Sequence, residues 1–190
     1  TLSEARRHKI LDLAYEHDVM ILDDEAYRDL WFEEPPPPSF SSLADGWGVI
    51  TTGTFSKTIA TGLRVGWIQA RPELLDLFSR MRFAMGQNQV GLRAVSEFLH
   101  NGEFEPHLEM IREVYRNKRD KLHEAMTREV SQYMDWSKPE GGFYLWAKLK
   151  PGLPLESVWR TAVHEGIAVN SGAGFSAGGG DSQNCIRIAY

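Results

Sequence analysis

The stretch "TTGTFSKTIATGLRVGW" (residues 51–67) decides how the first half of this 190-residue chain is interpreted. It begins with residues that favour β-strands, passes through a segment rich in turn formers, and returns to apolar residues at Val65. The pattern predicts one strand, a turn that carries Lys57 and Arg64, and a second strand. Most lysines and arginines are solvated at the surface. A reason for these two charges must therefore come from the rest of the chain.

The composition of the chain is that of a globular protein, with 42% hydrophobic and 25% charged residues. Its formal charge of −5 argues against general binding to nucleic acids or anionic membranes, but leaves room for a local cationic pocket. No apolar run is long enough to span a membrane, and the charged residues 1–9 lack the apolar core of a secretory signal. We therefore expect a cytoplasmic location, without nucleic-acid or membrane partners.

Cysteine and histidine give no sign of a disulfide or a metal site. Cys185 is the only cysteine, which excludes an internal disulfide and favours a reducing compartment. The six histidines are scattered, and none pairs with a cysteine or another histidine at metal-ligand spacing. We expect them to be solvated or satisfied on the surface, and we expect no metal.

The first hundred residues alternate between helical and strand patterns. Residues 1–4 fit a capping box at the start of a helix. The apolar residues 19–22 predict a buried parallel strand that runs into two aspartates. Residues 33–46 form a proline-rich loop. The other elements predicted here are strands at 48–54 and 65–70 and a helix at 72–85.

From about residue 101 the pattern changes to one long amphipathic helix, which continues to about residue 134. The elements predicted after it are a strand at 141–149, a helix at 155–166 and strands at 167–172 and 185–190. We therefore interpret residues 1–100 as part of a layered α/β domain and residues 101–190 as a smaller α+β domain.

Reactive side chains gather where two of the predicted strands end. In open α/β sheets, ligands bind beyond the carboxyl ends of the strands. The first strand is followed by Asp24 and Tyr27, and the second contributes four more residues, Thr54, Ser56, Lys57 and Arg64. A carboxylate, a phenol, two hydroxyls, an amine and a guanidinium can therefore converge on one ligand.

Each of these side chains also has an ordinary structural explanation. An aspartate after a strand often caps a turn or a helix. A nearby tyrosine is often half-buried packing, and a Ser-Lys pair in a turn usually faces solvent. The joint pattern is much rarer than its parts, which favours the functional interpretation.

Four segments together resemble a known enzyme family. They are "DEAY" (24–27), "TGTFSKTIATGLRVGW" (52–67), "PEGGFYLW" (139–146) and "IRIAY" (186–190). The chain resembles the class I/II aminotransferases, which are pyridoxal-phosphate enzymes of the aspartate aminotransferase fold (fold type I). The resemblance implies an α/β fold in which residues 1–100 belong to the large cofactor-binding domain and residues 101–190 form a smaller α+β domain.

The resemblance also implies a role for each residue at the strand ends. Pyridoxal phosphate binds amines covalently and withdraws electrons from the bond that breaks. Lys57 would bind the cofactor and then shuttle a proton, which makes it the catalytic residue. Asp24 would pair with the pyridine nitrogen, and Tyr27 would bind the ring oxygen. The phosphate would be held by Thr54, Ser56 and Arg64.

Arg187 stands alone in an otherwise apolar predicted strand, where an unpaired charge is costly. The resemblance implies that Arg187 binds the α-carboxylate of an amino-acid substrate, which suits the planar fork of its guanidinium. The alternative is an exposed arginine on an edge strand.

Members of this family are much longer than this chain, so we expect it to be the C-terminal portion of an aminotransferase. The family's Asn-Pro-x-Gly segment and glycine-rich phosphate loop, which complete the cofactor site, precede the part of the family pattern that matches residue 1. The isolated chain is therefore expected to be inactive. Its parent is expected to be a homodimer that moves an amino group between an α-amino acid and a 2-oxo acid.

Two other functions remain open. Some transcription regulators fuse a DNA-binding module to this same fold and use it as a ligand-sensing domain. A pyridoxal-phosphate lyase or decarboxylase on the same scaffold is also possible, because a lysine of this kind does not by itself fix the reaction. The sequence upstream of residue 1 would separate the enzyme from the regulator.

Overall fold

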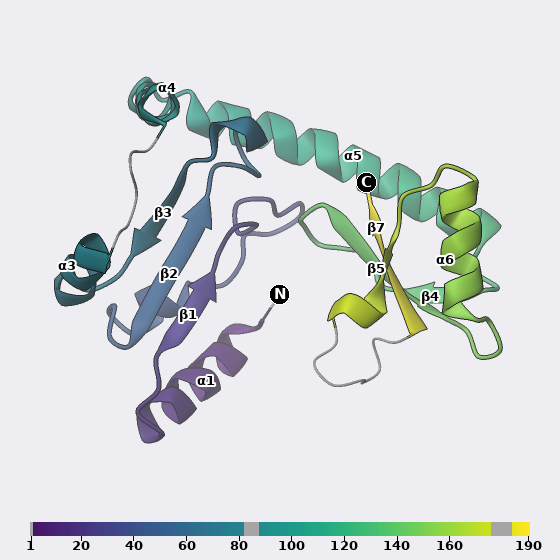
Figure 1. Ribbon diagram of the computed structural model, residues 1–190, viewed down its shortest axis with the longest axis horizontal. Helices are drawn as coiled ribbons and strands as arrows, with labels where there is room; N and C mark the ends of the chain where they lie inside the picture. Colours follow the sequence, from purple (N-terminus) through teal and green to yellow (C-terminus); the bar gives the residue numbers. More distant parts are fainter. Residues whose placement is uncertain (1, 82–87, 176–183) are drawn as a thin grey trace. The chain divides into compact units, whose positions relative to one another are not determined.

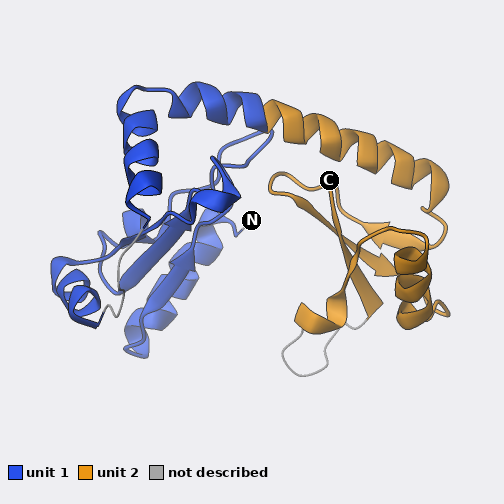
Figure 2. Ribbon diagram, turned by 45° about the horizontal axis from the view of Figure 1, so that its top comes forward, with its two compact units in different colours: residues 1–111 blue, residues 112–190 orange. Residues whose placement is uncertain are grey.

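The computed structural model describes residues 2–81, 88–175 and 184–190. The chain divides into two compact units, residues 1–111 and residues 112–190, and the division falls inside one long helix, α5 (Phe104–Glu129) (Figure 2). The boundary near residue 100, as a domain boundary of the whole protein, stays a prediction.

The first unit is a three-stranded sheet with helices around it (Figure 1). The strands lie in the order β1-β2-β3, with β1 parallel to β2 and β3 antiparallel to it. Its elements before α5 are α1 (Glu4–Glu16), β1 (Ile21–Asp24), α2 (Phe40–Leu43), β2 (Val49–Thr54), the 3₁₀ turn η1 (Thr61–Leu63), β3 (Gly66–Gln69), α3 (Pro72–Met81) and α4 (Gln89–His100). The predicted α/β class is thereby confirmed for this unit.

The start of the chain differs from the sequence prediction in two places. Helix α1 begins at Glu4 with Ser3 as its N-cap, and the Ser3 side chain makes no capping hydrogen bond. Thr1, the proposed capping residue, lies outside the described residues. Strand β1 runs from Ile21 to Asp24 rather than over 19–22, because Asp18 has a left-handed backbone with φ of 49° and turns the chain first.

Helix α4 was not predicted from the sequence. It contains a glycine and two valines, which are weak helix formers. Asn88 initiates it, because the Asn88 side-chain oxygen accepts a hydrogen bond from the Gly91 amide at 2.9 Å. The predicted helix at 72–85 is described as α3 up to Met81, and the rest of that range lies outside the described residues.

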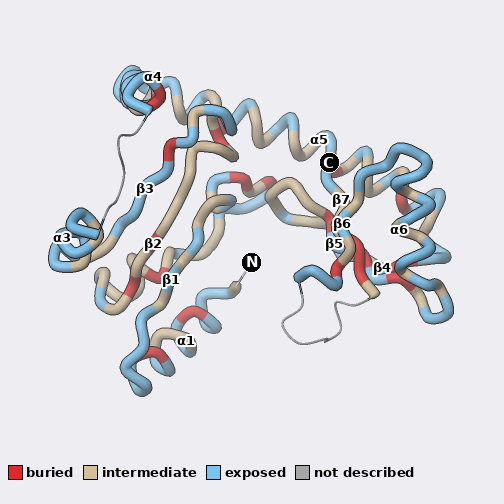
Figure 3. The backbone as a smooth tube through the Cα atoms, viewed as in Figure 1, coloured by how far each residue is buried: buried red, intermediate tan, exposed pale blue. Residues whose placement is uncertain are grey.

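Apolar residues of the sheet in the first unit remain accessible. All four residues of β3 are exposed, as Figure 3 shows by colour. Leu22 of β1 is 68% exposed and Ile68 of β3 is 50% exposed. Because Leu22 pairs with Ile50, and Ile68 with Thr52 of the same strand, these side chains share one sheet face. Strand β1, which the sequence predicted to be buried, therefore has an apolar residue that nothing in the described structure fully covers.

The second unit is an antiparallel sheet in the order β4-β5-β7-β6, accompanied by helix α6 (Leu155–His164) (Figure 1). Its strands are β4 (Met134–Trp136), β5 (Tyr144–Leu149), β6 (Asn170–Ser171) and β7 (Cys185–Ala189). The side chains of β5 alternate between buried and exposed positions, which is the pattern of a sheet with one face in the core. The core consists of Met126, Met134, Leu145, Ala147, Leu149 and Ile186, and Cys185 beside them is 3% exposed.

Two sequence predictions for the second unit were wrong in extent. The long helix ends at Glu129 rather than at Met134, because the following residues make a turn in which the Tyr133 amide donates to the Val130 carbonyl at 2.9 Å. Met134 then pairs with Leu149 in the sheet. The strand expected over 167–172 is reduced to two residues, β6, which pair with β7.

A polar cluster fastens α5 to the segment that follows β4. Arg119 of α5 is 1% exposed, and its guanidinium donates to the Pro139 carbonyl at 2.7 Å. Asp120 accepts from Arg119 at 2.9 Å and lies 2.8 Å from the Lys138 amino group. The hydrogen bond from Lys138 lowers the pKa of Asp120, and Arg119 lowers it further.

Asp120→Asn removes the charge at this cluster with little change of shape. The pKa of Asp120 is lower in the folded chain than in the unfolded one, so its stabilisation is present above the unfolded value and is lost as the pH falls through the folded value. We expect the variant to be less stable by about 0.5–1 kcal/mol at pH 7, since the partly exposed pair is screened by water. The difference should vanish in acid. Urea unfolding at several pH values measures it, with the exposed Asp135→Asn as control; an equal loss at every pH would contradict this account.

Candidate functional site

The turn that follows β2 is fastened to the start of β3 by one carbonyl group. The Val65 carbonyl oxygen accepts from the Phe55 amide at 3.0 Å and from the Thr54 hydroxyl at 3.2 Å. The Thr54 hydroxyl oxygen in turn accepts from the Ser56 amide at 3.1 Å. The chain therefore turns away from the sheet directly before Lys57, and the direction of the turn is fixed by these three bonds.

Bonds within the turn close it into a compact loop. The Phe55 carbonyl accepts from the Ile59 amide at 2.8 Å and from the Ala60 amide at 3.1 Å. The Thr61 hydroxyl donates to the Ser56 carbonyl at 3.0 Å. The Thr61 hydroxyl and the Ser56 carbonyl thus connect the two arms of the loop that carries Lys57.

Helices α4 and α5 hold the same loop from outside, through residues that sequence reasoning missed. A ring nitrogen of His107 lies 2.7 Å from the carbonyl oxygen of the buried Thr58. The Asn88 side chain donates to the Leu63 carbonyl at 3.3 Å. The Phe104 ring meets the Phe55 ring edge to face at 6.0 Å. An isolated histidine or asparagine gives no pattern in the sequence, so nothing marked these residues beforehand.

Arg64 ends the turn in a strained backbone conformation. Its φ of 55° and ψ of 39° lie in the left-handed region, which non-glycine residues seldom adopt and which costs about 1 kcal/mol or more. The bonds at Leu63 and Val65 hold the backbone on both sides of it. Strain of this kind concentrates at functional positions, and Arg64 is one of the residues that the sequence marked.

Lys57 and Tyr27, which come from the ends of different strands, lie together. The Lys57 amino group is 5.5 Å from the centre of the Tyr27 ring, within the range of a cation–π contact. Lys57 is half-buried, and Tyr27 is 37% exposed. The structure thus brings together an amine and a phenol that the sequence placed at one edge of the sheet.

Asp24 ends β1 and lies opposite Thr52 of β2. Its carboxylate accepts a hydrogen bond from the Ala26 amide at 3.1 Å and is otherwise exposed. The ordinary turn-capping explanation is therefore correct for Asp24, and the same bond also fixes where its carboxylate lies. Across the described ranges, no ion pair joins Asp24, Lys57 or Arg64 to another side chain.

The chemistry of these groups is compatible with a phosphorylated aromatic aldehyde. A guanidinium, hydroxyls and amides suit a phosphate ester, a carboxylate suits a basic ring nitrogen, and a primary amine suits an aldehyde. All six residues belong to the first unit. Among the described residues no group of three or more histidine, cysteine or acidic side chains could hold a metal ion.

Arg187 belongs to the second unit, in strand β7 between β5 and β6, so it is not on an edge strand. Its guanidinium carbon lies 4.1 Å from the centre of the Tyr144 ring and 4.5 Å from that of the Phe175 ring. One terminal nitrogen donates to the Asn170 side chain at 3.3 Å. The buried Nε has no hydrogen-bond partner among the described residues. The Arg187 guanidinium therefore has a donor group, Nε–H, that bonds to no described residue.

Comparison with known proteins identifies the family. A family model described as "Aminotransferase class I and II" matches residues 1–190. The chain belongs to this family. The predicted family membership is therefore confirmed, and pyridoxal phosphate, the cofactor expected from the sequence, agrees with it.

Curated relatives of this aminotransferase-family chain have two kinds of name. The 2-aminoadipate transaminase of Thermus thermophilus is 35% identical over 97% of this chain and 47% of its own length. An uncharacterised HTH-type transcriptional regulator of Bacillus subtilis, YisV, is 30% identical over all of this chain and 39% of its own length. The chain therefore spans less than half the length of both relatives.

Solved structures of the family confirm the fold. The α-aminoadipate aminotransferase LysN of Thermus thermophilus, complexed with N-(5′-phosphopyridoxyl)-L-leucine, matches with a TM-score of 0.87 at 34% identity over 96% of this chain and 48% of its own. The kynurenine aminotransferase of Pyrococcus horikoshii, in complex with PMP, matches with a TM-score of 0.90 at 29% identity over 100% of this chain and 47% of its own.

No described helix of our chain is long and apolar enough to cross a membrane.

Gly66 sets the contact between the turn and β3. A Cβ atom added there would lie 2.8 Å from the Gly53 carbonyl oxygen, which belongs to the backbone of the neighbouring strand and cannot move aside. We expect Gly66→Ala to destabilise the chain by about 1–3 kcal/mol. Gly62→Ala is the control, because a Cβ atom at Gly62 has nothing within 4 Å. Urea unfolding measures both variants. Equal stability of the two would show that β3 tolerates a shift away from β2.

Proposed function

We propose that the whole protein is a pyridoxal-phosphate-dependent aminotransferase that moves an amino group between an α-amino acid and a 2-oxo acid. The observation that carries the proposal is the Lys57 amine beside the Tyr27 phenol, in a turn closed by Thr54 and Ser56. Family membership supports the same reaction class. The amine is half-buried, which suits a group that reacts rather than one that only solvates the surface.

Lys57 is proposed as the catalytic residue. When bound, pyridoxal phosphate supplies a ring that withdraws electrons from the bond to be broken. Lys57 Nζ would hold the cofactor through its aldehyde carbon, with loss of water, and its free amine would accept the proton from the α-carbon of the substrate. The turn presents one amine at this edge of the sheet, and the bonds from the Phe55 amide and the Thr54 hydroxyl to the Val65 carbonyl fix the backbone from which that amine extends.

The other strand-end residues are proposed to orient the cofactor. Asp24 carries the negative charge that a protonated pyridine nitrogen requires, and Tyr27 donates its hydroxyl to the ring oxygen. The phosphate is assigned to Thr54, Ser56 and Arg64. The Thr54 hydroxyl already makes two bonds within the chain, so its contribution is mainly to shape the loop. Arg64 is exposed and makes no ion pair in the described structure, so its guanidinium is available for a phosphate.

Arg187 is proposed to bind the substrate α-carboxylate. Its Nε is buried without a hydrogen-bond partner among the described residues, and it is flanked by the rings of Tyr144 and Phe175. Aromatic walls reduce the competition from water, so a carboxylate that meets the half-buried guanidinium gains a strong charge-assisted bond. Arg187 would bind the α-carboxylate, which every α-amino acid and 2-oxo acid has. The preference for a particular substrate side chain is therefore not assigned.

The second candidate function is a ligand-sensing domain in a transcription regulator. HTH-type regulators of Bacillus subtilis and Staphylococcus aureus match the whole chain at 26–30% identity. We favour the enzyme because the transaminase of Thermus thermophilus matches at 35%. The whole protein, assayed with amino acids and a 2-oxo acid, tests this. Conversion that requires the 2-oxo acid indicates an aminotransferase, conversion without it indicates a lyase, and DNA binding without conversion indicates a regulator.

We further propose that the whole protein is a cytoplasmic homodimer and that the isolated 190-residue chain is inactive. The exposed apolar residues Leu22 and Ile68 support the inactivity of the isolated chain, since no described residue fully covers them on the sheet that carries the site. Sedimentation of the whole protein, and a transamination assay of the isolated chain, address the two statements separately.

Lys57→Ala should remove nearly all turnover of the whole protein and the absorption band of covalently bound cofactor, because no other amine lies at this turn. Lys9→Ala, on the exposed face of α1, is the matched control and should change neither. Borohydride reduction of the holoenzyme, followed by peptide mapping, locates the modified residue. A label on any lysine other than Lys57 would reject the assignment.

Arg187→Lys keeps the positive charge but loses the planar fork. We expect kcat/KM for both amino and 2-oxo acids to fall by about 100-fold, which corresponds to about 2.7 kcal/mol, while the affinity for pyridoxal phosphate changes little. Arg160→Lys on α6, which pairs with Glu156 at the surface, serves as the control. Weaker cofactor binding with normal substrate kinetics would place Arg187 in the cofactor site instead.

A further inference from the structure

Three acidic residues follow one another at the end of β1: Asp23, Asp24 and Glu25. Consecutive residues of a strand point to opposite faces of the sheet. Asp23, which lies opposite Thr51, faces α1, whereas Asp24, which lies opposite Thr52, faces the other side. Three adjacent negative charges repel one another, so each needs either solvent or a cation.

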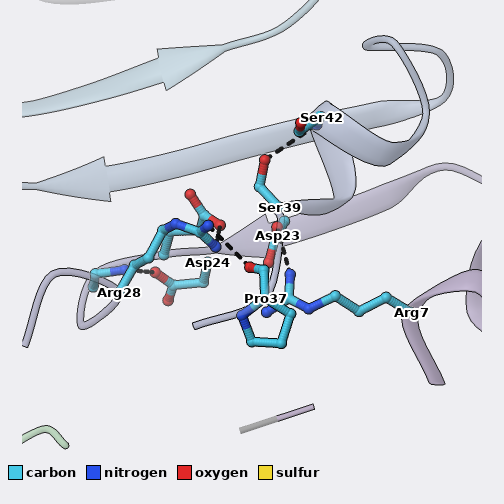
Figure 4. A network of polar contacts seen from close by, with 9 residues as sticks. Arg7, Asp23, Asp24, Arg28, Pro37, Ser39 and Ser42 are labelled. Atoms are coloured by element: carbon cyan, nitrogen blue, oxygen red, sulfur yellow. Dashed lines mark hydrogen bonds and ion pairs between the residues drawn. The ribbon is translucent and has the colours of Figure 1, made fainter. Parts of the chain in front are cut away.

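Arg7 of α1 extends toward Asp23 (Figure 4). Their nearest atoms, Arg7 Nη1 and Asp23 Oδ2, are 4.0 Å apart, and the two side chains are only 9% and 13% exposed. Both atoms are buried and have no hydrogen-bond partner among the described residues. Each charge therefore depends on the other for compensation, because neither has access to enough water to be solvated.

Packing holds Arg7 in this position. Its guanidinium carbon lies 5.0 Å from the centre of the ring of Phe40, which is itself 5% exposed. Arg7 is one of two buried residues of α1. An arginine at the same helix that only needed solvent would point outward, as its neighbour Arg6 does. These contacts therefore hold the Arg7 guanidinium at the end of β1.

Glu25 has a separate cationic partner. Its carboxylate accepts from Arg28 at 2.8 Å, and Arg28 also donates to the Pro37 carbonyl at 3.0 Å (Figure 4). The Glu25 amide donates to the Thr52 carbonyl at 2.9 Å, which prolongs the pairing of β1 with β2. Burial raises the pKa of Glu25, while the nearby Arg28 lowers it, so the Arg28 partner favours the charged form.

Two of the three carboxylates therefore have an arginine partner, and one does not. Arg7 compensates Asp23 and Arg28 compensates Glu25, whereas Asp24 has no cationic partner in the described ranges. Asp24 is also the exposed member of the three, and the one hydrogen bond that its carboxylate accepts among the described residues, from the Ala26 amide, fixes its orientation. A ligand cation that approaches this edge of the sheet meets a single uncompensated acid.

We propose that Arg7 is a positioning residue: by pairing with Asp23 on the far face of the sheet, it fixes the end of β1 so that Asp24 alone is presented to the cationic ring nitrogen of the cofactor. This inference rests on the proposed function, because it takes the cofactor role of Asp24 as given. It adds a residue on the opposite face of the sheet, in another element, that acts on the site through the backbone of β1.

The test uses the whole protein and five single variants together with one double variant. Arg7→Gln and Asp23→Asn each break the pair, and the double variant removes both charges. Asp24→Asn is the reference for a lost ring-nitrogen partner. Arg6→Gln is the matched control on the exposed face of α1, and Val49→Ala controls for stability, because Val49 is buried in β2 at its opposite end.

Two measurements other than activity distinguish positioning from stability. The first is the nitrogen-15 chemical shift of the ring nitrogen in bound, labelled pyridoxal phosphate, which reports whether that nitrogen carries a proton at a given pH. The second is the dissociation constant of the cofactor, measured beside the thermal unfolding of the apoprotein. A loss of stability alone lowers the unfolding temperature but leaves the protonation of the bound ring unchanged.

We expect Arg7→Gln to weaken cofactor binding about tenfold and to lower the pH at which the ring nitrogen loses its proton, in the direction of Asp24→Asn. Asp23→Asn should do the same, and the double variant should be no worse than either single change, because both act through one pair. Arg6→Gln should match the wild type, and Val49→Ala should change only the unfolding temperature.

The outcomes separate this inference from the function on which it rests. If Asp24→Asn lowers the pH of deprotonation but Arg7→Gln behaves like Val49→Ala, Arg7 is merely structural and the inference is wrong. If the effects of Arg7→Gln and Asp23→Asn add fully, the two residues act independently and the inference is also wrong. If Asp24→Asn itself leaves the ring nitrogen protonated, the cofactor role of Asp24 is wrong and the inference falls with it.

Discussion

The carbonyl oxygen of Val65 holds the proposed site together, because it accepts hydrogen bonds from both the Phe55 amide and the Thr54 hydroxyl. These bonds close a loop whose ends are β2 and β3, and the close approach of Gly66 to the Gly53 carbonyl keeps those strands in register. These bonds keep the loop compact, so the Lys57 side chain extends from it at the edge of the sheet. A lysine at the same place in a longer, looser loop would sample many positions and would lose the contact with Tyr27.

The sheet also separates two kinds of electrostatic task. On one face, buried charges are paired within the chain, as Arg7 is with Asp23. On the other face and at the strand ends, Asp24, Lys57 and Arg64 have no charged partner in the described structure. Pairing the buried charges within the chain reduces the electrostatic repulsion between them. Asp24, Lys57 and Arg64 keep their charges available for a ligand. In the second unit, Arg119 is hydrogen-bonded within the chain, whereas the buried Arg187 Nε has no hydrogen-bond partner among the described residues.

The sequence was sufficient for the features that depend on local pattern, and it was insufficient where long-range packing decides. The turn at Ser56 and Lys57 and the strands β2 and β7 follow from residue types and spacing, and the structure places β2 and β7 close to where the sequence did, whereas β1 and β6 have other bounds. Helix α4 was missed because its helical propensity is weak and its start depends on one Asn88 bond. The contact of His107 with Thr58 could not be read either, because it joins residues that only folding brings together.

The burial of Cys185 gives the second unit a natural reporter of its own opening. Cys185 lies in β7 next to Ile186 of the core and is 3% exposed, so an alkylating reagent reaches its thiol only when the structure around it opens. Cys185 is also the only cysteine of the chain, so the labelling signal has a single origin. The rate of alkylation under native conditions therefore reports how often the structure around β7, the strand that also carries Arg187, opens locally. No engineered probe is needed.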